Sequence, residues 1–348
     1  MNTRTAFSAM SMSATCTLAC LAAMPAGAND TMAELVAGGL NFVQTDAVSM
    51  VEEDLYISPE RVTVDYVFRN TSDSQVTSYI AFPMPDIKGD YESEIALNDR
   101  EADNFLGFTV TQDGQPIQPN LQQRVIATGI DMTDDVRGQD VPLLPFSDRT
   151  HEALAKLPSD VLEDWRARGL IYDDVYEDAG EMKHHPIPLW TLQSAYWWKT
   201  TFPAGQDVRV HHEYSPGVGG TAGISFAGEE FKGDDWFDKN QREYRQKYCI
   251  DDSFMRLADK LQKDMSAGTG PYYTESWISY VLKTGANWAG PIGKLRITID
   301  KGDKANFVSF CGNGVKKTGP TTFEMNAVDF MPEQDIHVLL LVRAQSEN

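Results

Sequence analysis

The segment VTVDYVFRN, residues 62–70, decides the fold class, because its side chains alternate between apolar and polar along the chain. One face carries Val62, Val64, Tyr66 and Phe68, and the other carries Thr63, Asp65 and Arg69. A period of two residues is typical of a β-strand with one buried face. Asn70-Thr71-Ser72-Asp73 supplies a turn, and the alternation resumes over residues 76–82 until Pro83-Met84-Pro85 ends it. The region therefore predicts two consecutive strands.

Strand patterns recur through most of the chain. They cover residues 108–110 and 115–117 around Asp113-Gly114, 194–202, 208–214, 295–299, 307–311 and 315–317 around Asn313-Gly314, and 336–342. Asp-Gly and Asn-Gly between alternating segments are strong hairpin signals. Runs of strands without regular β–α alternation argue against a doubly wound sheet. We therefore expect a mainly β fold of sandwich-like antiparallel sheets.

Two helical patterns interrupt the strands, near residues 151–169 and 251–267. The first divides into 151–157 and 160–169, where Asp160 with Glu163 is a candidate capping box and Gly169 a candidate stop. The second starts near Asp251 or Asp252, carries apolar residues at spacings of three and four, and stops at Gly268.

These patterns suggest how the chain divides. Residues 29–228 are expected to form an N-terminal sandwich-like region, with a helical and acidic-loop insertion at about 130–190. Residues 229–348 are expected to form a helix followed by a C-terminal antiparallel β region. We expect the two regions to pack together as one unit.

Residues 1–28 have the organisation of a cleavable secretory signal peptide. Arg4 is the one charged residue among them, an apolar stretch runs over residues 6–24, and Ala26-Gly27-Ala28 gives a small-x-small cleavage site. Cleavage after Ala28 would leave a mature chain that begins at Asn29 and works in the periplasm or outside the cell.

A lipid-modified Cys20 is the alternative interpretation of this segment. Leu18 lies one position too near Cys20 for a lipoprotein signal, which favours ordinary cleavage. The stretch is too interrupted by Ser and Thr for a membrane span, and no later segment approaches the required length. We therefore expect no transmembrane anchor after cleavage.

The chain is strongly acidic. Its formal net charge of -21 becomes -22 once Arg4 leaves with the signal peptide. Such a charge repels nucleic-acid phosphates, which excludes nucleic-acid partners.

Cysteine use is consistent with export. Two of the four cysteines, Cys16 and Cys20, leave with the signal peptide, so Cys249 and Cys311 remain. In an oxidising compartment a Cys249–Cys311 disulfide is the default, with two unpaired buried thiols as the alternative.

His211 and Glu213 form the strongest candidate for a metal or catalytic site in the sequence, with His184 and His185 as possible further metal ligands. Alternation over residues 208–214 turns His212 inward and leaves His211 and Glu213 on the outer face. Because a zinc site needs three or four converging ligands, this pattern favours a polar surface pair over a metal or catalytic centre.

Other motifs have weaker functional interpretations. Gly223-Ile224-Ser225-Phe226-Ala227 nearly matches a nucleophile elbow, but its last glycine is missing and an acidic loop, 229–235, is expected in place of the following helix. Gly217 to Ala222 fits a dinucleotide fingerprint without the helix that such a site needs. Calcium candidates without EF-hand spacing are Asp131, Asp134 and Asp135, and Asp173, Asp174, Glu177 and Asp178. Candidates for a sugar-stacking platform are Trp190, Tyr196, Trp197 and Trp198, of which at least half should be core.

Several longer segments together indicate a family. They include residues 37–40 (AGGL), 53–58 (EDLYIS), 67–70 (VFRN), 81–86 (AFPMPD), 248–251 (YCID), 284–288 (TGANW), 290–293 (GPIG) and 308–312 (VSFCG). In these segments the chain resembles the bacterial domain of unknown function 4424 family over essentially its whole mature length. The resemblance implies an exported protein with a matched pair of cysteines and no known activity. The N-terminal part is also similar to the β-sandwich that opens inter-alpha-trypsin-inhibitor heavy chains, which is an interaction scaffold.

These observations favour a non-catalytic binding or cell-envelope structural module without a cofactor, whose partner is an unknown envelope or extracellular protein or ligand. A metal-dependent or serine hydrolase near His211 and Glu213 is the first alternative. A calcium- or carbohydrate-binding module is the second.

Overall fold

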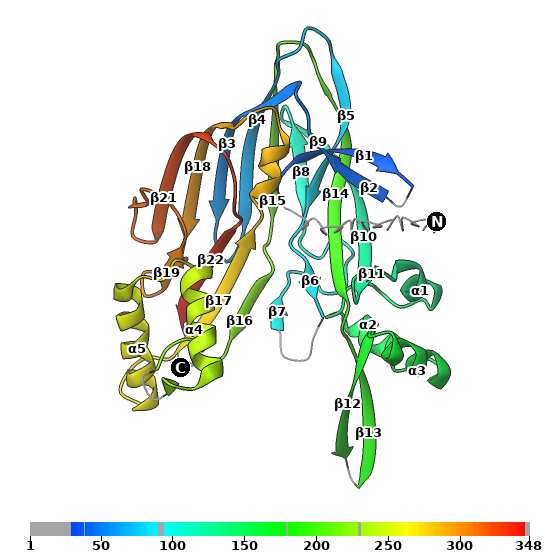
Figure 1. Cartoon of the computed structure of the whole chain (residues 1–348), viewed down its shortest axis with the longest axis vertical. Helices are drawn as coiled ribbons and strands as arrows, with labels where there is room; N and C mark the ends of the chain where they lie inside the picture. Colours follow the sequence, from blue (N-terminus) through cyan, green and yellow to red (C-terminus); the bar gives the residue numbers. More distant parts are fainter. Residues whose placement is uncertain (1–28, 38, 90–93, 179, 229–230, 345–348) are drawn as a thin grey trace, which may run out of the picture.

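The computed structural model describes residues 29–37, 39–89, 94–178, 180–228 and 231–344. Strands dominate and helices are inserted between them, so the predicted mainly β fold is confirmed (Figure 1). Ala26 and Ala28 of the predicted cleavage site lie outside the described residues, whereas Asn29 lies within them.

Two large sheets share the main hydrophobic core. The seven-stranded sheet has the order β11-β10-β14-β5-β1-β2, with β6 paired to β14. Its strands are β1 (Thr31–Val36), β2 (Gly39–Val43), β5 (Val76–Pro83), β6 (Ile87–Lys88), β10 (Asn120–Ala127), β11 (Ile130–Asp131) and β14 (Thr191–Phe202). The eight-stranded sheet has the order β20-β21-β18-β3-β4-β15-β8-β9. Its strands are β3 (Val48–Ile57), β4 (Val62–Asn70), β8 (Thr109–Gln112), β9 (Gln115–Ile117), β15 (Asp207–Tyr214), β18 (Ile292–Asp300), β20 (Lys316–Lys317) and β21 (Thr322–Phe330).

Strand β4 contains the alternating residues 62–70, and its apolar face is buried in the main core as predicted. It pairs with β3 on one side and with β15 on the other, both antiparallel. One pairing departs from the expected antiparallel pattern, because β18 lies parallel to β3. Alternation along one strand indicates which face is buried but not which strand becomes its neighbour, so this pairing was not predictable from the pattern.

A five-stranded sheet, with the order β19-β22-β17-β16-β7, separates the main core from a second core. Its strands are β7 (Glu94–Ala96), β16 (Val218–Thr221), β17 (Tyr273–Tyr280), β19 (Phe307–Phe310) and β22 (Ile336–Arg343). In β22, Val338 and Leu340 face the main core, while Leu339 and Leu341 face the second. Helices α4 (Asp235–Lys247) and α5 (Asp252–Ser266) lie against this sheet and close the second core (Figure 1).

The insertion contains three helices, of which the second and third lie near the predicted ranges 151–157 and 160–169 and the first was not predicted. They are α1 (Thr133–Gly138), α2 (Asp148–Leu154) and α3 (Ser159–Ala167). The predicted capping box of Asp160 with Glu163 is wrong, because Pro158 occupies the N-cap and no side chain caps the helix. Gly169 has a φ of +73°, a conformation that glycine adopts without strain, and it lies just beyond the end of α3 as predicted.

Two elements were not predicted from the sequence: a hairpin within the acidic segment of the insertion, and a helix that begins at Asp235, where the acidic loop predicted over 229–235 ends. Strands β12 (Ile171–Asp178) and β13 (Glu181–Pro188) form a two-stranded hairpin that projects from the body in Figure 1. Most of its residues are exposed, so it has no buried face and no apolar alternation to reveal it. The second element is α4, whose Asp234 side chain accepts a 2.9 Å hydrogen bond from the Phe237 backbone nitrogen. Its single buried residue is too weak an apolar pattern to predict a helix.

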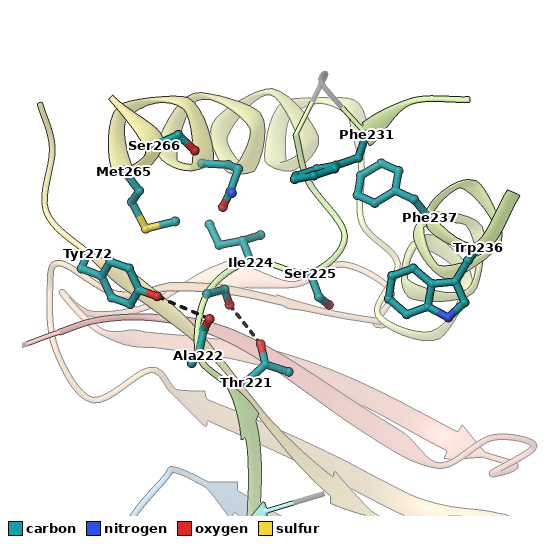
Figure 2. Close-up of a pocket in the computed structure, with 12 residues that line it drawn as sticks. Thr221, Ala222, Ile224, Ser225, Phe231, Trp236, Phe237, Met265, Ser266 and Tyr272 are labelled. Atoms are coloured by element: carbon teal, nitrogen blue, oxygen red, sulfur yellow. Dashed lines mark hydrogen bonds between the residues drawn. The ribbon is translucent and has the colours of Figure 1, made fainter. Parts of the chain in front are cut away.

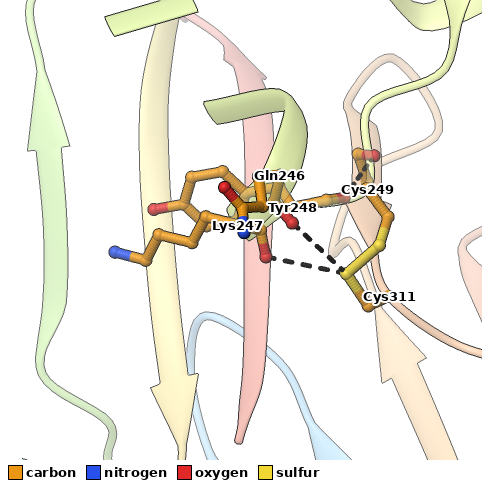
Figure 3. Close-up of a disulfide and its surroundings, with 6 residues drawn as sticks. Gln246, Lys247, Tyr248, Cys249 and Cys311 are labelled. Carbon is orange, nitrogen blue, oxygen red and sulfur yellow. Dashed lines mark hydrogen bonds between the residues drawn. A yellow bond between two sulfur atoms is a disulfide. The ribbon is translucent and has the colours of Figure 1, made fainter. Parts of the chain in front are cut away.

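The Cys249–Cys311 disulfide is present, with 5.0 Å between the two Cα atoms (Figure 3). Cys249 lies between α4 and α5, with a φ of +50°, and Cys311 follows β19 directly. The bond therefore fixes the connection between the two helices to the edge strand of the five-stranded sheet.

Candidate functional site

A cavity of about 460 Å³ opens between α4, α5 and the segment that follows β16 (Figure 2). Ile224, Phe237 and Met265 line the cavity. Ile224 belongs to the second core, Met265 packs against it, and Phe237 is buried. Figure 2 shows the cavity enclosed on one side by α5 and on the other by α4. Three of the exposed aromatic side chains of the described residues border this cavity.

Three of these side chains are the main feature of the cavity. Phe231 is 48% exposed, Trp236 is 67% exposed and Tyr272 is 50% exposed, and all three border the cavity. A single exposed apolar side chain is normal on a protein surface, but several around one hollow mark a binding site. An aromatic ring left in water at a cavity rim is available to stack on a ligand.

The segment from Thr221 to Ser225 is held in place by hydrogen bonds at the base of the cavity. The Thr221 hydroxyl donates to the Gly223 carbonyl oxygen at 3.1 Å, and the Tyr272 hydroxyl donates to the Ala222 carbonyl oxygen at 3.4 Å (Figure 2). Gly223 has a φ of +125°, which favours glycine at this position. The turn directs Ile224 into the second core.

A buried carboxyl group fixes the next residue. Glu275, only 1% exposed, accepts a hydrogen bond from the Ser225 backbone nitrogen and a 2.8 Å hydrogen bond from the Tyr244 hydroxyl. Burial raises the pKa of Glu275, and these hydrogen bonds oppose that rise. The carboxyl group thus ties α4 to the base of the cavity.

Ser225 was considered as a nucleophile in the sequence, and the structure places it at the cavity. The hydrogen bonds recorded for Ser225 in the described residues are with Tyr244, Glu275 and Asn240. None of them supplies the imidazole base that a serine nucleophile uses. The Ser225 hydroxyl lies 3.4 Å from the Tyr244 hydroxyl, and the arrangement positions a loop rather than activating an oxygen.

The cavity lining is neutral. None of the described residues that line it is charged, and its polar members are Thr221, Ser225, Gln262 and Ser266. The Gln262 side-chain oxygen is buried without a hydrogen-bond partner, so it is an acceptor without a donor. The cavity therefore combines aromatic surface with a few uncharged polar groups.

The four histidine and glutamate candidates for a metal site lie in two different sheets. His211 and Glu213 belong to β15, and the His211 Nδ1 atom lies 2.9 Å from Asp65 on β4, so its partner is Asp65 and not Glu213. His184 and His185 belong to β13, where His184 contacts Asp173 at 2.8 Å and His185 stacks on His151. Within the described ranges, no group of three His, Cys, Asp or Glu side chains could hold a metal ion.

The other sequence candidates are engaged elsewhere. Asp131 forms an ion pair with Arg124 at 2.7 Å and accepts hydrogen bonds from Thr133. Of the four residues considered for a sugar-stacking platform, Trp190, Tyr196 and Trp198 are buried, so most of that group is core, as predicted. The inward orientation predicted for His212 is confirmed, because its side chain is fully buried.

The aromatic residues of the cavity escaped the sequence analysis because they are far apart in the sequence. Phe231 and Trp236 flank the start of α4, and Tyr272 precedes β17. No sequence motif joins them, and recognising α4 as a helix would have been the one available signal.

Within the part of the chain that the structure covers, no helix is long and apolar enough to cross a bilayer.

Comparisons with known proteins identify a family and include distant structural likenesses. The family model of the domain of unknown function DUF4424 matches residues 28–339. No curated protein matches the sequence. A solved structure from Legionella pneumophila subsp. pneumophila str. Philadelphia 1, described as a "putative nutrient binding protein", is similar with a TM-score of 0.40 and 15% identity. That alignment covers 90% of this chain and 70% of the other.

Proposed function

This chain belongs to the DUF4424 family, and we propose that it is an exported binding module that holds a neutral, ring-bearing small molecule, such as a neutral sugar, in the cavity between α4 and α5. The observation that carries the proposal is the gathering of three exposed aromatic side chains, Phe231, Trp236 and Tyr272, around one cavity. The function is binding without catalysis.

The size of the cavity supports a small-molecule ligand. Small-molecule sites in proteins have volumes of roughly 300–1,000 Å³ and combine apolar walls with a few placed polar groups. The cavity of about 460 Å³ falls within that range. Ring stacking on Trp236 or Tyr272 would replace water on the aromatic faces that are now exposed.

The lining indicates the chemical class of the ligand. Without a charged side chain among the described lining residues, an ionic ligand would lose its hydration and gain no counter-charge. The net charge of -21 further disfavours an anion. The unpartnered oxygen of Gln262 calls for a donor, which a hydroxyl group supplies. A neutral sugar has both the apolar ring face and the hydroxyl donors.

Export is supported by the residues that precede Asn29 and by the disulfide. Arg4, the apolar stretch and Ala26-Gly27-Ala28 form a signal-peptide pattern. Disulfides persist in oxidising compartments, and the Cys249–Cys311 bond is consistent with such a compartment. The proposed location is the periplasm or the outside of the cell.

Isothermal titration calorimetry with a panel of neutral mono- and oligosaccharides tests the proposal, with the corresponding uronic acids as anionic controls. At least one neutral sugar should bind, and its acid counterpart should bind more weakly. Trp236→Ala should reduce the affinity about five- to 150-fold, the effect of losing a ring-stacking contact of about 1–3 kcal/mol.

Tyr176→Ala is the control, because Tyr176 is also an exposed aromatic residue and lies on the distant β12–β13 hairpin. It should leave the affinity unchanged. The proposal is wrong if no neutral sugar binds, or if the two variants change the affinity equally.

A further inference from the structure

The first three residues after the predicted cleavage site are enclosed in the protein. Asn29, Asp30 and Thr31 are all polar, and each is 0% exposed. Residues at a new chain end are normally exposed and poorly ordered unless something ties them down. Here the burial requires a dedicated set of partners.

The short 3₁₀ helix η2 (Lys283–Asn287) and the residue after it provide those partners. The Asn29 backbone nitrogen donates to the Thr284 hydroxyl oxygen at 3.0 Å, and the same hydroxyl donates to the Asn29 carbonyl oxygen at 2.7 Å. The Trp288 indole nitrogen donates to the Asp30 carbonyl oxygen at 2.7 Å. Thr284, Gly285 and Trp288 together form what we call the N-terminal socket.

Gly285 shows that the socket is shaped for residue 29. A Cβ atom at this position would lie 2.6 Å from the Asn29 side-chain nitrogen and 3.3 Å from Ile292. The first distance is shorter than a van der Waals contact, so a larger residue would displace the Asn29 side chain.

Two carboxyl groups lie beside the socket without a basic partner. The Asn29 side-chain nitrogen donates to Glu53 Oε2 at 3.1 Å, and the Tyr280 hydroxyl lies 3.4 Å from Glu53 Oε1. Burial and the nearby Glu53 carboxyl raise the pKa of Asp30, and among the described residues neither Asp30 nor Glu53 has an ion pair with Lys or Arg. Lys283 of η2 is itself paired with Asp335 at 3.3 Å.

The remaining titratable groups around the cluster do not supply a positive charge. His212 of β15 has its Nε2 atom 3.6 Å from Asp30 Oδ2, but burial lowers the pKa of His212 well below its usual value and so favours the neutral ring. Tyr66 of β4, Tyr214 of β15 and Tyr280 of β17 are buried, and burial raises the pKa of each hydroxyl. The cluster therefore contains two buried acids and no cation.

The His212 ring nitrogens beside Asp30 have no hydrogen-bond partner, and neither do three buried acceptor atoms: Asn29 Oδ1, Asp30 Oδ1 and Asp30 Oδ2. All three belong to the two residues that follow the predicted cleavage site. Buried polar atoms in native proteins are nearly always satisfied, and an unpaired buried carboxylate is costly. The site lacks a group with several N–H donors and a positive charge.

We propose that cleavage between Ala28 and Asn29 completes this site, because the α-ammonium group that cleavage creates on Asn29 is the missing cation of the buried Asp30–Glu53 cluster. The inference rests on the proposed export. A peptidase of the exporting cell uses one water molecule to hydrolyse the Ala28–Asn29 bond. The leader departs with the new Ala28 carboxylate, and the Asn29 nitrogen becomes an amine that takes up a proton.

Cleavage increases the number of N–H donors on the Asn29 nitrogen. In the uncleaved chain the Asn29 nitrogen has a single N–H, which Thr284 accepts. An ammonium group has three N–H donors, so two become available to the unpartnered oxygens of Asn29 and Asp30. The uncleaved chain keeps two buried acids without a counter-charge, so it folds less stably than the mature chain. Processing thereby stabilises the folded state only after export.

Three versions of the full mature chain test the proposal: one that begins at Asn29, one that begins at Ala28, and one that begins at Asn29 with an acetylated amine. The Asn29 chain should melt at a higher temperature than both others. In the folded Asn29 chain an amine-reactive reagent at about pH 6.5 should label the α-amine at least about ninefold more slowly than in urea, which corresponds to a pKa raised by one unit from about 7.7.

The double variant Asp30→Asn/Glu53→Gln separates charge from shape. It keeps the side-chain sizes but removes both acids, so acetylation should no longer lower its melting temperature. Terminal sequencing of the exported protein should give Asn29 as the first residue. A different first residue, equal melting of the three chains, or an acetylation effect that persists in the double variant would each overturn the proposal. Sugar binding by all three chains is measured in parallel, so a failure here is distinct from a failure of the proposed function.

Discussion

Replacing both disulfide cysteines with serine should cost the protein about 4 kcal/mol of folding free energy. Cys249 and Cys311 are 62 residues apart in the sequence. In the chain-entropy model a crosslink over a loop of that length removes about 14 cal/mol/K from the unfolded ensemble, which is about 4 kcal/mol at 25 °C. Cys249 is exposed and Cys311 half-buried, so the serine hydroxyls themselves add little to the loss.

The loop that the disulfide closes contains α5, β17 and β18, so its loss affects both the second core and the eight-stranded sheet. The assay is urea denaturation of the wild type and of the Cys249→Ser/Cys311→Ser variant at pH 7, followed by circular dichroism. The wild type treated with a reducing agent is the control and should match the variant. A loss below about 1 kcal/mol, or a reduced wild type that differs from the variant, would refute the reasoning.

Three further predictions concern buried and exposed polar groups. Tyr244→Phe removes the hydroxyl that donates to Glu275 at 2.8 Å but keeps the ring that stacks on Phe226. It should lower the free energy of unfolding, measured by urea denaturation, by about 1–3 kcal/mol. A loss below about 0.5 kcal/mol would show that the hydroxyl is not needed. In a chain that still carries Ala28, burial raises the pKa of Glu53 from 4.5 in the unfolded state to about 8 in the folded state. The buried, protonated Glu53 therefore contributes fully to folding stability below pH 4.5, and this contribution is lost as the pH rises to 8. Glu53→Gln should flatten this decline, which amounts to about 5 kcal/mol at most, and an unchanged pH profile of the melting temperature would contradict it. His211→Ala breaks a partly exposed contact with Asp65 and should change the free energy of unfolding by no more than about 1 kcal/mol. Metal analysis of the purified wild type should find no stoichiometric zinc. One zinc per chain in the wild type that disappears in the variant would reverse this interpretation.

The strands could be predicted from sequence wherever one of their faces is buried. Residues 62–70 alternate because β4 has the main core on one side and solvent on the other. The hairpin β12–β13 has no buried face along most of its length, so its acidic residues resembled a loop. The alternation rule reports burial, and it fails where a strand is exposed on both sides.

The site was harder to predict than the fold. The disulfide followed from counting cysteines, but the cavity joins Phe231, Trp236 and Tyr272 through the packing of α4 and α5 on the five-stranded sheet. Likewise, the sequence predicts Asn29 as the mature terminus but does not bring it next to Glu53, 24 positions away. Both sites depend on tertiary contacts that no local pattern encodes.

The most direct test of the binding proposal is ¹⁹F NMR of the protein labelled with 5-fluorotryptophan. The chain has seven tryptophans, and Trp236 is the one that lines the cavity among the described residues. Each resonance can be assigned by a single Trp→Phe substitution. On titration with the neutral saccharide panel, the account predicts that the Trp236 resonance shifts and saturates while those of buried Trp165 and Trp190 stay in place. A Trp236 resonance that no neutral saccharide moves, or a saturating shift confined to the buried tryptophans, would contradict it.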